Sequence, residues 1–453
     1  MGPRGTLRRA LVTSSLVLLL TGIAAALLLA PRQAVASPLP HEGSYKPGEV
    51  IVRYQAETDQ LAQARVESRT GTSTETSLLT ASKRLEIEDG ESVRTTISEL
   101  RRDRRVAYAV PNYVAHAGAF QPNDPGFPLQ WNFWGPFGIN VPEAWSLARL
   151  RKAPGGRGVV VAVLDTGVAY RNVRRYRRAP DLDSFVRGHD FVDDDRLPLD
   201  VNGHGTHVAG TIAEATNNGI GATGIAYKAS IMPVRTLDAT GAGDAVTISR
   251  GIRYAVRHGA DVINLSLEFA PFVRAPDIPD VLAAIRYARR HGVVVTAVAG
   301  NEATTNVPYP ARAKGVIAVA ATTESGCRAK YSNAGEQVDV AAPGGGDDAL
   351  PAPDDPWDVA HCRPEASGRS IYQQTFSWNV ARFSLPSGYY GTSMAAPHVA
   401  GLAALLIGSR RLGPSPSPAA VERRIERTAR DIGPPGFDVG FGHGLIDAAA
   451  ALR

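Results

Sequence analysis

The apolar residues change their spacing along the chain, and from about residue 156 onward two periods alternate. Short runs of consecutive apolar residues, typical of strands buried on both faces, lie at 159–164, 230–235, 261–267, 293–299, 316–321 and 338–341. Between several of these runs apolar residues recur at helical spacing, as at 245–257 and 281–290. This alternation predicts an α/β fold, with a doubly wound, mostly parallel sheet flanked by helices. In such sheets functional residues gather at the carboxyl ends of the strands.

The chain before this alternation has a different pattern, which predicts a small α+β unit of its own. Strands are expected at 49–54, 85–87 and 106–110, with helices near 61–66 and 93–100. A stretch rich in Gly, Pro and Asn follows at 115–126 and indicates a linker or a processing region. Further along, residues 344–390 are rich in Pro, Gly, Ser and Asp without periodicity, so we expect a long surface insertion there.

The N-terminus has the pattern of an export signal. Three arginines precede an apolar run over residues 10–30, and the sequence Ala-Val-Ala at 34–36 has the A-x-A form of a cleavage site. We therefore expect a signal peptide over 1–36, a secreted, extracellular protein, and no stable membrane association after the signal is removed. Because the run is long enough to cross a bilayer, an uncleaved membrane anchor is the alternative.

Charge and cysteine content narrow the possible partners. The net charge of +5 includes two arginine clusters, at 101–105 and 171–178, but neither is interleaved with the aromatic residues of a base-stacking surface. We interpret them as solvated loops and expect no nucleic-acid partner. The two cysteines, Cys327 and Cys362, exclude zinc-finger spacing. In an exported protein they indicate one disulfide, and two free buried thiols are the alternative.

A serine with small neighbours lies where a glycine-rich loop leads into an apolar helix, in the sequence GTSMAAPHVAG at 391–401. Apolar residues beyond it recur at helical spacing, which places Ser393 at a helix N-terminus. Free backbone N–H groups and the positive end of the helix dipole favour developing negative charge there. Ser393 is therefore a candidate nucleophile, and a helix N-cap is the alternative.

Other candidate catalytic residues follow apolar strands or begin a helix. Asp165 comes directly after the strand at 159–164, and Asn301 follows the strand at 293–299. His204 begins a helix of small residues, with His207 one turn further on. Asp165, His204 and His207 could together act as three zinc ligands, but the HExxH pattern of zinc proteases is absent. We interpret His204 as a general base and His207 as structural, while Asn301 either caps a turn or donates to an oxyanion.

Four motifs in this order, VAVLDTGV, NGHGTHVAGTIA, AVAGNEA and GTSMAAPHVAG, resemble the subtilase family of serine proteases over about residues 120–453. The resemblance implies a subtilisin-like serine endopeptidase that hydrolyses peptide bonds through an acyl-enzyme. Ser393 would attack the scissile carbonyl, His204 would take its proton, and Asp165 would orient the imidazole. Asn301 and the Ser393 amide would bind the oxyanion.

The resemblance also implies a set of substrate-binding residues. Two edge segments would hold an extended peptide as an added strand, and a YPA motif would lie beside the specificity pocket. The residues are Gly241, Gly243, Ser266, Leu267, Glu268, Gly300, Tyr309 and Pro310. Where the family commonly has glycine this chain has Glu268, a carboxylate that either selects basic side chains or points to solvent.

The segment TNNGIGATG at 216–224 contains the GxGxxG spacing but follows a helix rather than a strand, so we expect no dinucleotide and no organic cofactor. By resemblance this loop wraps a structural calcium ion, which takes oxygen ligands. The implied ligands are the side chains of Asp124, Asp181 and Asn218 and the backbone oxygens of Thr216, Ile220 and Ala222. An ordinary tight loop is the alternative.

The resemblance finally implies a domain organisation and a set of partners. Residues 37–117 would form an inhibitory propeptide that also assists folding, and residues 118–453 the peptidase domain. A permanent binding module at the N-terminus is the alternative to a propeptide. The expected partners of the monomeric enzyme are protein and peptide substrates and its own propeptide. Two rival functions are a non-catalytic binding protein that kept the fold and an esterase that uses the same serine.

Overall fold

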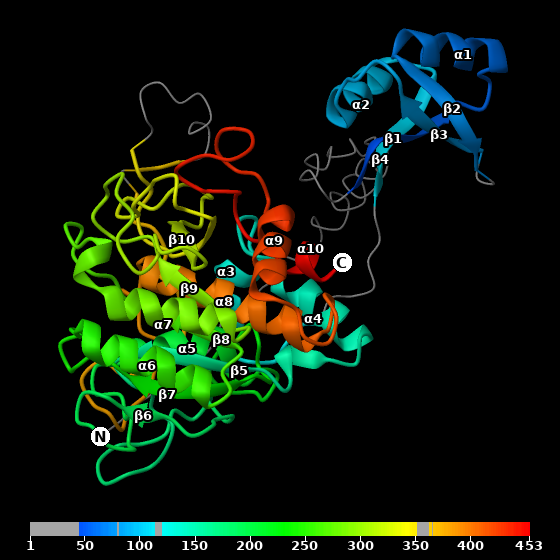
Figure 1. The fold of residues 1–453 in the computed structure, drawn as a ribbon. Helices are drawn as coiled ribbons and strands as arrows, with labels where there is room; N and C mark the ends of the chain where they lie inside the picture. Colours follow the sequence, from blue (N-terminus) through cyan, green and yellow to red (C-terminus); the bar gives the residue numbers. More distant parts are fainter. Residues whose placement is uncertain (1–44, 79–80, 114–119, 351–361, 365) are drawn as a thin grey trace, which may run out of the picture. The chain divides into compact units, whose positions relative to one another are not determined.

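A computed structural model describes residues 45–78, 81–113, 120–350, 362–364 and 366–453 (Figure 1). The chain divides into two compact units, Met1–Ala117 and Gly118–Arg453. The predicted signal peptide over 1–36 lies outside the described residues. Within the described ranges, every helix is too short or too polar to cross a bilayer.

The N-terminal unit is a four-stranded antiparallel sheet covered by two helices, with strand order β2-β3-β1-β4. Its elements are β1 (Tyr45–Tyr54), α1 (Gln60–Arg69), β2 (Thr72–Ser77), β3 (Ser82–Ile87), α2 (Val93–Arg102) and β4 (Val106–Tyr113). Val50, Leu85 and Ile97 belong to a hydrophobic core within this unit. The predicted α+β character is confirmed. The strand β2 was not predicted, because it contains only polar residues and therefore has no apolar period.

The C-terminal unit is built on a seven-stranded sheet with the order β11-β10-β9-β8-β5-β7-β6, in which all neighbouring strands are parallel. The strands are β5 (Val160–Asp165), β6 (His189–Asp190), β7 (Ser230–Arg235), β8 (Val262–Leu265), β9 (Val294–Val298), β10 (Ile317–Thr322) and β11 (Val340–Pro343). The predicted doubly wound α/β fold is confirmed. The edge strand β6 was not predicted, because two residues are too few to show a period.

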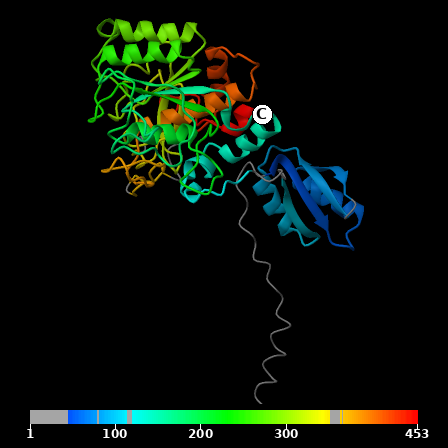
Figure 2. The same cartoon turned by 90° about the horizontal axis from the view of Figure 1, so that it is seen from below.

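Helices cover both faces of this sheet. Along β5, Val161 and Val163 belong to one core with α5 (His204–Ala213) and α8 (Thr392–Gly408). The alternate residues Ala162 and Leu164 belong to a second core, with α6 (Ala245–Arg257) and α7 (Pro279–Arg290). The helices α6 and α7 pack side by side, in shades of green (Figures 1 and 2). Both faces are therefore buried, which explains the continuous apolar runs of the strands.

Further helices complete this unit around the sheet. They are η1 (Phe127–Leu129), α3 (Trp131–Trp134), α4 (Val141–Leu150), η2 (Pro154–Gly156), η3 (Ala275–Asp277), α9 (Pro418–Thr428) and α10 (Ala448–Leu452). Trp145 of α4 is fully buried, and its indole N–H donates to the carbonyl oxygen of Ile225 at 2.8 Å. The segment before β5 therefore belongs to the same core as α5 and α8.

The order of the strands creates a crevice at the carboxyl end of β5. After β5 the chain builds β6 and β7 on one side, then crosses over to place β8 on the other. Connections that leave in opposite directions open a gap above the sheet at such a point, where ligands bind in open α/β folds. Asp165 is the last residue of β5 and therefore lies at this gap.

The expectation that 344–390 is a surface insertion is wrong for part of its length. Ile371, Gln373, Thr375 and Phe376 are at most 2% exposed. The hydroxyl of Thr375 donates to the carbonyl oxygen of Gly203 at 2.6 Å, just before α5. This stretch is held by polar contacts with the backbone of Gly203, just before α5, and with the side chain of His207 in α5, as well as by apolar packing. Its burial therefore left no hydrophobic period in the sequence.

Cys327 and Cys362 form a disulfide, with their Cα atoms 5.8 Å apart. The alternative of two free thiols is therefore wrong. The bond joins the segment that follows β10 to the interior of the 344–390 segment. Asp348 lies beside it and accepts a hydrogen bond from the backbone N–H of Arg363 at 2.6 Å.

Candidate active site

The carboxylate at the end of β5 holds the imidazole at the start of α5. Asp165 is fully buried, and its Oδ1 lies 2.7 Å from His204 Nδ1. The same oxygen accepts the backbone N–H of Thr166 at 2.7 Å, which fixes the carboxylate plane. Desolvation lowers the pKa of His204, but the charge and hydrogen bond of Asp165 raise it more, so that it lies above 6.5. A buried anion thus stabilises the imidazolium form.

Sequence reasoning missed Asp200, which anchors the N-terminal end of α5. Its Oδ1 accepts the backbone N–H of Asn202 and of Gly203, both at 2.9 Å. Its Oδ2 accepts the hydroxyl of Thr206 at 2.6 Å and that residue's N–H at 2.9 Å. Gly203 itself has a φ of +105°, and a Cβ there would lie 2.4 Å from the carbonyl oxygen of Phe376. An acidic residue a few positions before a helix was the only available sign of this role.

His207 does not face the candidate catalytic pair. Its Nε2 lies 3.0 Å from the carbonyl oxygen of Ile371, and its ring stacks on Tyr389 at a centroid distance of 4.2 Å. Burial lowers its pKa to about 3, so the ring is neutral at ordinary pH. These contacts support the structural role expected for His207 and leave the zinc alternative without its third ligand.

Ser393 is the second residue of α8, and Gly391 occupies the N-cap position. The alternative that Ser393 caps the helix is therefore wrong. A residue in the first turn has a backbone N–H with no acceptor inside the helix. The helix dipole adds positive potential at the same place. The N–H of Ser393 is thus suited to bind a developing negative charge.

A proline four residues further on changes the backbone around Ser393. Pro397 has no N–H, so it cannot donate the helical hydrogen bond to the carbonyl oxygen of Ser393. The hydroxyl of Ser266 donates to that oxygen instead, at 2.9 Å. Ser266 in turn accepts from the side-chain amide of Asn264 at 2.9 Å. The start of α8 is therefore attached to the segment that leaves β8.

The amide of Asn301 is oriented by the residue before the serine. Its Oδ1 accepts the backbone N–H of Thr392 at 2.8 Å and the hydroxyl of Thr392 at 3.0 Å. Its Nδ2 is directed the other way and lies 3.5 Å from Oε1 of Glu268. Gly300, with a φ of +104°, makes the turn that brings Asn301 there from β9. Because its oxygen is occupied by Thr392, Asn301 presents an N–H donor to the site.

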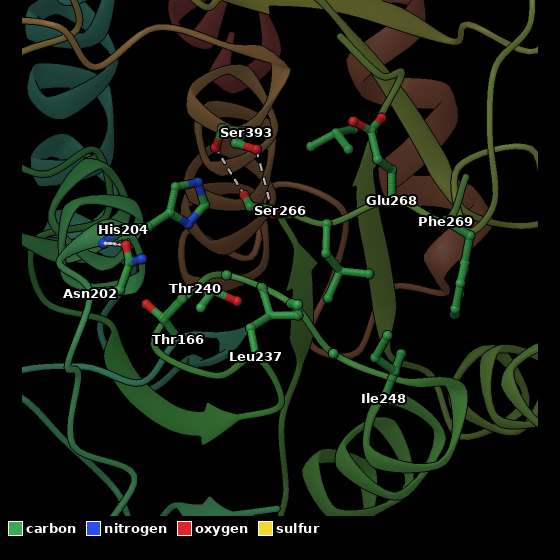
Figure 3. A pocket seen from close by; sticks show the side chains of 15 residues that line it. Thr166, Asn202, His204, Leu237, Thr240, Ile248, Ser266, Glu268, Phe269 and Ser393 are labelled. Atoms are coloured by element: carbon green, nitrogen blue, oxygen red, sulfur yellow. Dashed lines mark hydrogen bonds between the residues drawn. The ribbon is translucent and has the colours of Figure 1, made fainter. Parts of the chain in front are cut away.

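A cavity of about 470 Å³ lies at this site (Figure 3). His204 and Ser393 line it, together with five predicted substrate-binding residues, Gly241, Gly243, Ser266, Leu267 and Glu268. The hydroxyl of Ser393 donates to the carbonyl oxygen of Ser266 at 3.4 Å rather than to His204. Hydrogen bonds of catalytic serines are often loose before substrate binds, so this rotamer fits a resting site.

The other three predicted substrate-binding residues, Gly300, Tyr309 and Pro310, do not line this cavity. Tyr309 and Pro310 are joined by a cis peptide bond, and the carbonyl oxygen of Tyr309 accepts the N–H of Phe269 at 2.8 Å. Gly300 lies against the carboxyl group of Glu268. Oε2 of Glu268 is enclosed, so the alternative that this side chain points to solvent is wrong.

The predicted calcium ligands form a second acidic cluster, which is outside the cavity. Asp124 and Asp181 are at most 2% exposed, and the loop at 216–222 folds around them. Asp181 accepts from the Asn218 side chain at 2.6 Å and from the N–H of Ala222 at 3.0 Å. Burial and then the charge of Asp124 raise the pKa of Asp181 to about 7. Among the described residues no Lys or Arg pairs with either carboxylate, so the cluster fits a cation.

Comparison with known proteins identifies the family. The profile of the Subtilase family matches residues 156–444, and that of the Fervidolysin N-terminal prodomain matches residues 31–112. A thermophilic serine proteinase of Bacillus sp. (strain AK1) is 34% identical over 91% of this chain and 89% of its own. Thermitase of Thermoactinomyces vulgaris is 38% identical over 74% of this chain and 100% of its own.

Solved structures agree with this result. A protease from Pseudoalteromonas arctica superposes with a TM-score of 0.58 at 34% identity, over 74% of this chain and 99% of its own. A lanthipeptide protease superposes with a TM-score of 0.57 at 26% identity, over the same shares. The fold and the relatives define the class of the protein as a serine endopeptidase with an N-terminal prodomain. The chain belongs to the subtilase family.

The bond between Ser266 and Ser393 gives a test of how the nucleophile is positioned. In Ser266→Ala the Ser393 carbonyl loses its donor, and Pro397 cannot replace it. We expect the free energy of unfolding to fall by about 1–3 kcal/mol. We also expect kcat to fall more than KM rises, because the nucleophile is displaced rather than the substrate. Denaturant unfolding in a Ser393→Ala background and steady-state kinetics of the active chain measure the two effects.

Ser249→Ala is the matched control for this prediction. Ser249 is also a buried serine, but its hydroxyl bonds to the carbonyl oxygen of Val246 within its own helix. The role given to Ser266 is wrong if both variants lose the same stability and keep the same kcat.

Proposed function

We propose that this subtilase is an exported endopeptidase, made as a preproprotein, that removes its own propeptide and cleaves proteins through Ser393, His204 and Asp165. Ser393 attacks the scissile carbonyl and forms the acyl-enzyme, while His204 takes the proton of the hydroxyl. Asp165 holds the imidazole in the required tautomer. The Ser393 N–H and the Asn301 amide stabilise the oxyanion.

The observation that carries this proposal is the 2.7 Å hydrogen bond between the buried Asp165 and His204, a residue that lines the same cavity as Ser393. A base that is oriented by a buried carboxylate and placed beside a helix-borne hydroxyl is the arrangement that activates a serine. The prodomain match over 31–112 supports a zymogen. The apolar run and the Ala-Val-Ala sequence support export. The intact set of catalytic groups argues against a non-catalytic binding protein.

We further propose that the cluster of Asp124 and Asp181 holds a structural calcium ion. Two neighbouring carboxylates buried without a cationic side chain are costly unless a cation compensates them. Asn218 and the backbone oxygens of Thr216, Ile220 and Ala222 belong to the surrounding loop and supply the oxygen ligands that calcium prefers. The ion would stabilise the fold and take no part in the chemical step.

Self-processing is tested with Ser393→Ala. We expect the wild-type chain to be cut between about Val114 and Asn123 and the Ser393→Ala chain to keep its propeptide, because the variant has no nucleophile. N-terminal sequencing of both purified proteins measures this, and Ser377→Ala, an exposed serine, is the control. Identical N-termini in wild type and Ser393→Ala would show that another protease cuts the chain. Activity towards esters but not peptides in the wild type would favour the esterase alternative.

The pH dependence follows from the pair of His204 and Asp165. The base must be neutral to accept a proton, so kcat/KM falls as the pH decreases through the pKa of His204. Because Asp165 raises this pKa, we expect the acid limb to have its midpoint above 6.5. In Asp165→Asn the residual activity should have its acid limb at lower pH. Profiles with one peptide substrate measure both midpoints, and the same acid limb in both proteins would contradict the prediction.

Calcium removal is expected to lower stability without changing the chemistry. A ligand present at about 100 times its dissociation constant stabilises the folded state by about 2.7 kcal/mol. The Tm should therefore fall when a calcium chelator is added and recover when calcium is restored. Asp181→Asn should lower the Tm and remove most of the chelator effect, whereas Asp183→Asn, an exposed neighbour, should keep it. A Tm indifferent to chelator in the wild type would favour the ordinary tight loop.

A further inference from the structure

Glu268 lies between the substrate edge and the oxyanion donor. It follows β8 by three residues and lines the cavity next to Leu267. Its carboxyl group lies on the side away from Leu237 and Ile248 (Figure 3). Oε1 is 3.5 Å from Asn301 Nδ2, and Oε2 is enclosed without a hydrogen-bond partner among the described residues. A buried carboxylate oxygen without a partner needs a proton or a cation.

A second carboxylate faces Glu268 across the turn at Gly300. A Cβ placed on Gly300 would lie 2.7 Å from Oε2 of Glu268 and 2.9 Å from Oε2 of Glu302. Both oxygens therefore surround the same small space. Glu302 is held there by Asn333, whose Nδ2 donates to it at 2.6 Å. Glycine is needed at position 300 both for its positive φ and for this space.

Among the described residues, no Lys or Arg side chain neutralises the charge of Glu268 or Glu302. Neither carboxylate forms an ion pair within the described ranges of the chain. The groups around Glu268 are Glu302, the neutral amide of Asn301 and, on another wall of the same cavity, His204. Burial and then the charge of Glu302 raise the pKa of Glu268 to about 7. Glu268 therefore holds a proton up to near-neutral pH when no cation is bound.

The position of the pair identifies which part of a substrate meets it. The carbonyl attacked by Ser393 places its oxygen at Asn301, and Glu268 lies beside that same amide. The side chain of the residue that supplies this carbonyl is therefore the part of the substrate nearest to the two carboxylates. This step rests on the proposed function, since it takes Ser393 as the nucleophile and Asn301 as the oxyanion donor.

We propose that Glu268 and Glu302 together form the binding site for a cationic substrate side chain, and that the enzyme cleaves after lysine and arginine. When an ammonium or guanidinium group enters, it takes the place of the proton on Glu268. One cation is bound between the two carboxyl groups, and one proton leaves Glu268 for solvent. A neutral side chain such as leucine leaves the proton in place and gains no charge-assisted hydrogen bond.

The test compares mature wild type, Glu268→Gln, Glu302→Gln and Glu336→Gln on peptides that differ only in the residue before the cut. Glu336 is an exposed glutamate away from the cavity and is the matched control. We expect the wild type to prefer lysine and arginine over leucine by about tenfold or more in kcat/KM. Either Glu268→Gln or Glu302→Gln should lose most of this preference, through a fall in kcat/KM on the lysine and arginine peptides that is larger than any change on the leucine peptide. Glu336→Gln should behave as the wild type.

The second measurement is the ratio of kcat/KM on the lysine peptide to kcat/KM on the leucine peptide, followed as a function of pH. Both substrates depend equally on His204, so the ratio of their kcat/KM values isolates the carboxyl pair. We expect the ratio to rise between about pH 5.5 and about pH 8.5 in the wild type, because the proton that competes with the cation is lost over this range. In Glu268→Gln the ratio should stay flat. A flat ratio in the wild type would contradict the exchange of proton and cation.

A binding experiment that needs no catalysis completes the test. Benzamidine, a cationic probe, should bind the wild type more tightly than Glu268→Gln and release protons in calorimetry near neutral pH, whereas neutral benzyl alcohol should bind both alike. Equal benzamidine binding, or a wild type that cleaves leucine peptides as well as lysine peptides, overturns this proposal and leaves the proposed endopeptidase intact. If no peptide is cleaved in a Ser393-dependent way, the proposed function fails instead, and benzamidine still reports on the pair.

Discussion

The site depends on one constraint, namely that parallel strands end at the same edge of the sheet. Asp165 ends β5, Ser266 follows β8, and Asn301 follows β9, and these three strands are neighbours in the order β9-β8-β5. Residues that are far apart in the sequence therefore reach one place without long loops. The remaining residue of the site, Ser393, belongs to α8, a helix that packs on the same three strands. The chemistry thus requires a correct sheet before it requires any particular loop.

The sequence predicted the parts of this arrangement that follow from period and position. Apolar runs placed the strands, and the polar residues directly after them, Asp165 and Asn301, were candidates because of where they stand in the chain. Contacts between polar groups that are far apart in the sequence could not be predicted, because they produce no pattern in it. The hydrogen bonds of Asp200 and the burial of Thr375 depend on polar groups from separate parts of the chain, and such contacts have no periodicity in the sequence. Pro397 was visible, but its effect depends on a partner, Ser266, in another element.

Buried acids in this protein have contrasting environments, and the contrast separates their roles. Asp165 is paired with an imidazole, and Asp200 is saturated by hydrogen-bond donors. Asp181 accepts two hydrogen bonds but, like Glu268, also faces another carboxylate, and burial raises the pKa of both. A carboxylate that is satisfied by the protein itself is a structural or positioning group. One that is left beside a like charge favours a cation from outside.

A protease is exposed to its own activity, and the buried stretch around Ile371 bears on how long such a molecule survives. Cleavage by a subtilase requires a segment to leave its surroundings and lie extended along an edge of the active site. Gln373, Thr375 and Phe376 are enclosed beneath the start of α5, and the disulfide from Cys327 restrains the chain before them. A copy of the enzyme meets these peptide bonds only after local unfolding. The rate of cleavage within this stretch is then set by how often the segment opens rather than by its sequence.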